Sequence, residues 1–69
     1  MQVYRLNIST IGIQSVDGKA IPVVIPGGAM LGRLREETTF AVCVWDGGEV
    51  QVLSLDLQER GVLMSRVGH

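Results

Sequence analysis

The chain has 69 residues, of which 46% are hydrophobic, and six basic and seven acidic side chains give it a net charge of −1. One cysteine and one histidine exclude an intrachain disulfide and a Cys/His metal cluster, and the scattered basic residues form no tract for a phosphate backbone. We expect a single domain over residues 1–69. Because so short a chain buries only about 60% of its unfolded surface, its apolar surplus predicts association.

The first 13 residues have the pattern of a strand that bends. Tyr4, Leu6 and Ile8 alternate with polar residues, which is typical of a half-buried strand. The alternation then shifts phase around Gly12, and a glycine inside such a shift predicts a bulge or sharp bend.

The next segments are predicted to be short strands separated by turns. Asp17-Gly18 is a turn signal between two apolar runs, and Ala20–Ile25 is the second strand. Pro22 should lie at a sheet edge, because proline cannot donate to a ladder. Ile25-Pro26-Gly27-Gly28 fits a type II turn with Pro26 at its second position.

Residues 29–39 fit two interpretations. Ala, Met, Leu, Arg and Glu favour a helix, but Gly32 interrupts the run and no capping residue precedes it. Alternation suits a strand, so we expect Ala29–Leu34 to be a strand and Arg35–Thr39 to be a loop.

A β-hairpin is predicted over residues 40–53. A three-residue loop at Asp46-Gly47-Gly48 would place Trp45 opposite Glu49 and keep the valines on one face. A two-residue loop would set Val44 against Glu49 and split the valines, so we prefer the longer loop. The expected core residues are then Phe40, Val42, Val44, Val50 and Val52. The other face would carry Ala41, Cys43, Trp45, Glu49 and Gln51.

After the hairpin we expect one helical turn and a closing strand. Asp56 with Glu59 three residues later resembles a capping box, and Gly61 suits a helix end. The strand would resume over 62–67, and Gly68 and His69 would fray.

Three stretches carry a resemblance to known proteins. They are Val44-Trp45-Asp46-Gly47, Val50-Gln51-Val52 and Asp56-Leu57-Gln58-Glu59-Arg60-Gly61. An all-β chain of five or six short strands, with one short helical turn before the last strand, resembles an SH3-like small barrel. The C-terminal half is also similar to short uncharacterised bacterial proteins with a V-x-W-x-G hairpin followed by D-L-x-x-R-G. The resemblance to this bacterial group implies no activity.

Few side chains are candidates for chemistry. Cys43 lies between valines without a neighbouring base, so we expect a buried core or interface thiol. The carboxylates of Asp46, Glu49, Asp56 and Glu59 could pair only in a site shared between subunits, because a chain this small has little room for a pocket. We therefore expect no catalytic residue, no cofactor and no metal.

The sequence favours a non-catalytic interaction or assembly module that associates with itself, most simply as a dimer. Candidate interface residues are Trp45, Leu63 and Met64, because Trp is enriched at binding hot spots and a strand shows alternate residues to each side. A protein partner is a second option. A nucleic-acid-binding barrel is the alternative, followed by an enzyme with a site shared between subunits. The N-terminus lacks a basic start followed by an apolar run, so we expect a cytoplasmic protein without a membrane segment.

Overall fold

A computed structural model describes residues 1–66 of the chain. Their elements are β1 Gln2–Leu6, β2 Thr10–Val16, β3 Lys19–Ile25, β4 Met30–Glu36, β5 Phe40–Trp45, β6 Gly48–Leu53, α1 Ser54–Arg60 and β7 Gly61–Arg66. The predicted frayed end at Gly68 and His69 lies outside the described residues.

The strands form one antiparallel sheet in the order β3-β2-β6-β5-β4-β1-β7, which confirms an all-β chain with a short helix before its last strand. The described residues form seven strands rather than five or six, because residues 1–13 make two strands and not one bent strand. Within residues 1–66 the two end strands, β3 and β7, do not pair with each other. The sheet is therefore not closed, and the predicted SH3-like barrel is not confirmed.

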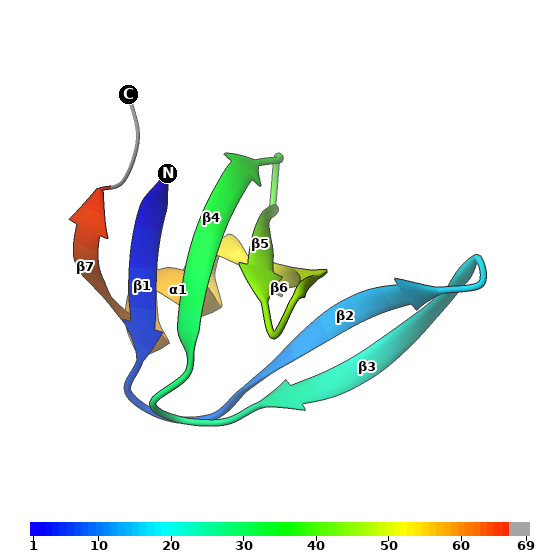
Figure 1. Ribbon diagram of the computed structural model, residues 1–69, viewed down its shortest axis with the longest axis horizontal. Helices are drawn as coiled ribbons and strands as arrows, with labels where there is room; N and C mark the ends of the chain where they lie inside the picture. Colours follow the sequence, from blue (N-terminus) through cyan, green and yellow to red (C-terminus); the bar gives the residue numbers. More distant parts are fainter. Residues whose placement is uncertain (67–69) are drawn as a thin grey trace.

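The β2–β3 hairpin projects from the rest of the sheet as an arm (Figure 1). Its two-residue turn holds Asp17 at φ 51° and Gly18 at φ 76°, the left-handed conformations that a tight hairpin turn requires. Within the described residues one pair, Ile13 with Gln51, joins the arm to β6. Pro22 lies in β3 at the sheet edge, as predicted.

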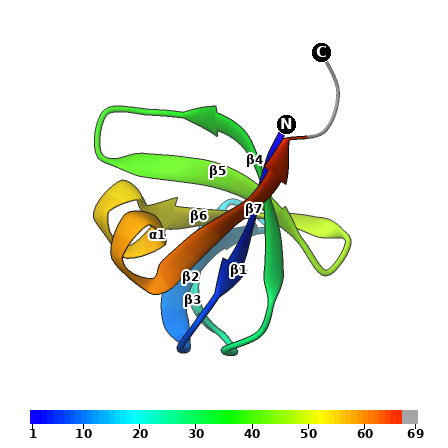
Figure 2. The same cartoon turned by 90° about the vertical axis from the view of Figure 1, so that its left-hand side faces the viewer.

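The sheet curls around a core on its inner face, and α1 packs beside it between β6 and β7 (Figure 2). Leu57 is the helix residue that reaches the core. Buried side chains from five strands complete the cluster: Leu6, Ile25, Leu31, Ala41, Cys43, Val50 and Val52.

The predicted register of the 40–53 hairpin is wrong by one residue. Asp46 and Gly47 both have positive φ, at 53° and 78°, and form a two-residue loop that pairs Trp45 with Gly48. Asp-Gly is well suited to such a loop, because its twist matches that of the flanking strands. Ala41, Cys43 and Trp45 consequently share the inner face with Val50 and Val52, while Phe40, Val42 and Val44 lie on the outer face.

Placing the valines on one face did not give the correct register, because β5 buries side chains on both faces. Val42 is almost fully buried, yet it lies on the outer face, opposite Gln51 and away from the core cluster. Val44, on the same face, is exposed. A strand that is covered on both sides gives no clean alternation from which to deduce its register.

The short helix differs from the predicted capping-box turn. It spans seven residues and begins at Ser54, and Leu53 at the capping position offers no side-chain hydrogen bond. Asp56 lies inside the first turn, so its predicted role as the cap is wrong. The helix ends at Gly61 as expected, in an extended conformation, and a Cβ there would come 2.7 Å from the Leu57 carbonyl oxygen.

Two other segments differ slightly from expectation. The strand predicted over Ala29–Leu34 is confirmed from Met30, and β4 continues to Glu36, with an irregularity at Leu34 where the register against β5 shifts. The preceding turn lies one residue later than predicted: the Ala29 amide donates to the Pro26 carbonyl at 3.2 Å, and Gly28 takes the positive φ of 90°.

Candidate interaction surface

The side of the arm that faces away from the core is apolar along its length. Residues opposite each other in an antiparallel pair share a face, and Ile11 pairs with Val24. Ile11 and Val24 are 62% and 64% exposed, although isoleucine and valine are among the residues most often buried. We name this surface the outer arm face; it comprises Ile11, Ile13, Ser15, Ala20, Pro22 and Val24, and carries no charge.

A groove of about 430 Å³ lies at the base of the arm. It forms where β2 and β6 diverge, because beyond the Ile13–Gln51 pair no further pair joins the two strands in the described structure. The groove is lined by Ile11, Ile13, Phe40, Gln51, Leu53 and Asp56. Its walls are mostly apolar, with one amide and one carboxylate as polar groups.

The outer arm face and the groove form one surface, because Ile11 and Ile13 belong to both. Together they expose on the order of 500 Å² of apolar surface, which is comparable with the largest apolar patches of typical monomers. Such patches are often functional, so this surface is the candidate site for interaction.

Of the predicted interface residues, Trp45 contributes to packing against the core. Its side chain is half-buried and packs against the core on the inner face of β5. Leu63 lies opposite Tyr4, and Met64 has no opposite residue because the β1–β7 register shifts there. Leu63 and Met64 are 43% and 49% exposed. Since β4 and β1 separate β5 from β7, the structure does not bring Trp45 together with this pair.

The arm residues were not among the predicted interface residues. Their signal was present in the sequence: apolar residues continue through both strands on either side of the Asp17-Gly18 turn. That pattern predicts strands, but it cannot show that the hairpin leaves the body of the sheet and uncovers one side.

Cys43 is a buried core thiol, as predicted. Burial raises the pKa of its thiol to about 11, although the charge of Arg33 lowers the pKa in part. At neutral pH the side chain is therefore a thiol rather than the nucleophilic thiolate.

The carboxylates weighed as an acid–base pair are dispersed. Asp56 lines the groove, whereas Glu49 lines a second hollow of about 210 Å³ with Arg35 and Val42. Asp46 lies in the β5–β6 turn.

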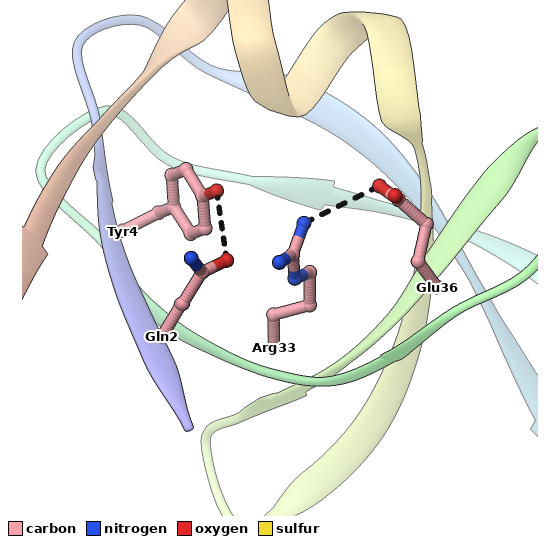
Figure 3. Close-up of polar contacts among 4 residues, drawn as sticks. All are labelled: Gln2, Tyr4, Arg33 and Glu36. Carbon is pink, nitrogen blue, oxygen red and sulfur yellow. Dashed lines mark hydrogen bonds and ion pairs between the residues drawn. The ribbon is translucent and has the colours of Figure 1, made fainter. Parts of the chain in front are cut away.

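Arginine side chains are engaged locally. Arg33 Nη1 lies 3.3 Å from Glu36 Oε1, and the Tyr4 hydroxyl donates a hydrogen bond to Gln2 Oε1 at 3.3 Å (Figure 3). The Arg33 guanidinium also lies 5.9 Å from the centre of the Tyr4 ring, within range of a cation–π contact. Arg35 pairs with Glu37 at 3.1 Å. Both guanidinium groups are therefore engaged in contacts with side chains of the same chain.

Comparisons with models of known families, with curated proteins and with solved structures found no match to this chain. Within residues 1–66, no three His, Cys, Asp or Glu side chains gather where they could hold a metal ion. The single helix of this part of the chain is too short to cross a membrane.

Proposed function

We propose that this protein is a non-catalytic interaction module that associates with itself. The observation that carries the proposal is the uncharged outer arm face, on which Ile11 and Val24 leave more than 60% of their surface in water. A soluble chain gains free energy when such a surface is covered, and symmetric pairing of identical subunits is the commonest way to cover it.

The size of the exposed surface is sufficient for a dimer. Burying about 500 Å² of apolar surface on each subunit contributes on the order of 25 kcal/mol for the pair, before the entropy of association and side-chain ordering are subtracted. A gross contribution of this size supports dimerisation at micromolar concentration.

The described structure gives no observation that favours either of the two alternatives suggested by the sequence. A nucleic-acid-binding surface needs free cations around aromatic platforms, but Arg33 and Arg35 form ion pairs with neighbouring glutamates. A shared active site would need carboxylates that converge, whereas Asp56 and Glu49 line different hollows.

We infer an SH3-like arrangement from the order of strands with a helical turn before the last one, which supports this assignment although the sheet is open. A reducing, cytoplasmic setting is supported by the free, buried Cys43 thiol.

Sedimentation velocity on the purified chain tests the proposed function. We expect a dimer at tens of micromolar that dissociates on dilution. A well-folded monomer at that concentration would contradict self-association. Binding to mixed oligonucleotides at low and moderate salt is the companion assay, because salt-sensitive binding would favour the nucleic-acid alternative.

A further inference from the structure

We propose that two copies of the chain associate through their arms, packed antiparallel with outer arm face against outer arm face, so that the tip of each arm lies in the groove of the other copy. This inference rests on the proposed function and names its partner and its surface. The tip is defined as the turn at Asp17-Gly18 with the flanking Val16 and Lys19.

The arrangement follows from where the groove lies on the arm. The groove is at the arm's base, beside Ile11, and the tip lies at the other end of β2, which has seven residues and is about 23 Å long. A two-fold axis through the middle of the arm therefore sets each tip over the base of the other arm. A two-fold interface must be self-complementary, and a projecting tip with a hollow at its own base fulfils that condition.

The open edge of the arm is a poorer surface for pairing than its face. In a hairpin with a two-residue loop, hydrogen-bonded pairs alternate outward from the closing pair, which is Val16 with Lys19. Pro22 then falls in a non-hydrogen-bonded pair with Ile13, so its nitrogen points to the open edge. Because proline has no N–H, the centre of that edge lacks a donor, which disfavours pairing edge to edge.

The absence of charge on the outer arm face permits a second copy as the occupant, because an uncharged surface does not repel its own copy. The arm carries two charged residues, Asp17 inside the turn and Lys19 at the start of β3. Lys19 pairs with Val16, so its side chain lies on the face opposite the outer arm face and stays outside the proposed contact.

The buried area also fits a dimer. The outer arm face and groove expose on the order of 500 Å² of apolar surface, and a standard interface buries about 800 Å² on each partner, including a polar rim. The tip residues and the groove margin supply that rim.

A pair of variants on one strand tests which face of the arm is used. Val24→Lys places a charge on the outer arm face, and Ile21→Lys places the same charge on the opposite face of β3, at a side chain that is 43% exposed. We expect Val24→Lys to weaken dimerisation at least tenfold and Ile21→Lys to leave it within about twofold of the wild type. Circular dichroism of each variant verifies that the fold is kept.

A charge at the tip end of the outer arm face tests the contact with the groove. Ala20 lies on that face beside the turn, so antiparallel arms bring it toward the groove that Asp56 lines in the second copy. Ala20→Glu should weaken self-association about tenfold more than Ala20→Lys, because only the glutamate repels the carboxylate of Asp56. Equal effects of the two variants would overturn the proposed contact between tip and groove.

The outcomes separate the two proposals. Dimers that survive Val24→Lys but dissociate with Met64→Lys would overturn the arm arrangement and leave self-association standing. A wild-type monomer would overturn both. Loss of the dimer with Val24→Lys but not with Ile21→Lys, together with a weaker dimer for Ala20→Glu than for Ala20→Lys, would support the arrangement.

Discussion

A Cβ atom on Gly12 would lie 2.5 Å from Cγ2 of Val50, so the close approach of β2 to β6 requires glycine at this position. The Ile25 side chain and the Gln51 carbonyl oxygen would also be within 3.2 Å of that atom. Gly12 directly precedes Ile13 in β2, and Ile13 pairs with Gln51 to join the arm to the sheet. Gly12 therefore governs how the arm meets the body, rather than marking a bulge as its position in the sequence suggested.

The first prediction is that Gly12→Ala destabilises the fold. Val50 is fully buried and cannot move aside freely, so the added methyl group should lower the free energy of unfolding by about 1–3 kcal/mol. Urea denaturation measures the difference. Gly48→Ala is the matched control, because no atom lies within 4 Å of its Cβ position. Equal denaturation midpoints for the two variants would contradict the close contact.

The second prediction separates the two glycines of the β5–β6 turn. Gly47 has a φ of 78°, where a side chain costs about 1 kcal/mol or more, whereas Gly48 lies outside the left-handed region and pairs with Trp45. Gly47→Ala should therefore lower the denaturation midpoint clearly more than Gly48→Ala. The reverse order would favour the three-residue loop.

Local turn chemistry made much of the fold predictable. Asp17-Gly18 marked the first hairpin, Pro22 marked an edge strand, and Gly61 marked the end of the helix. Each is a residue whose backbone requirement is independent of the rest of the chain. For the same reason Asp46-Gly47 identified a turn, even though the preferred loop length was wrong.

Features that depend on long-range packing were not predictable from the pattern. Val42 is buried on the outer face and Cys43 on the inner face, so the hydrophobic pattern of β5 did not set its register. The candidate surface was missed for a similar reason. Apolar residues such as Ile11 and Ile13 are expected in a core, and only the arrangement of the strands shows that the arm leaves them in water.

The third prediction concerns stability in alkaline solution. The folded-state pKa of the Cys43 thiol is about 11, against an ordinary value of 9.0. Below pH 9 both states keep the proton and the stability is unaffected. As the pH rises from about 9 to 11 the unfolded chain loses it first, so the free energy of unfolding should fall by up to about 3 kcal/mol.

Denaturation midpoints at pH 7, 9 and 10.5 measure this effect in the wild type and in Cys43→Ala. Other groups that titrate in this range are shared by both proteins, so the difference between their slopes isolates the thiol. Parallel slopes would show that burial of Cys43 does not control this pH dependence.

The last prediction concerns the open edge of the arm. Proline at position 22 leaves the centre of the outer edge of β3 without a donor, between the outward N–H groups of Ala20 and Val24. Pro22→Val supplies the missing N–H and keeps an apolar side chain on the outer arm face. The edge then becomes a continuous template for strand pairing, so species larger than the wild-type assembly should form. Light scattering at increasing concentration detects them. Ile21→Val is the control, because the N–H at that position points toward β2 and the edge is unchanged. If Pro22→Val scatters no more light than this control, the proline does not protect the edge. Its presence then no longer favours packing through the face of the arm over pairing at the edge.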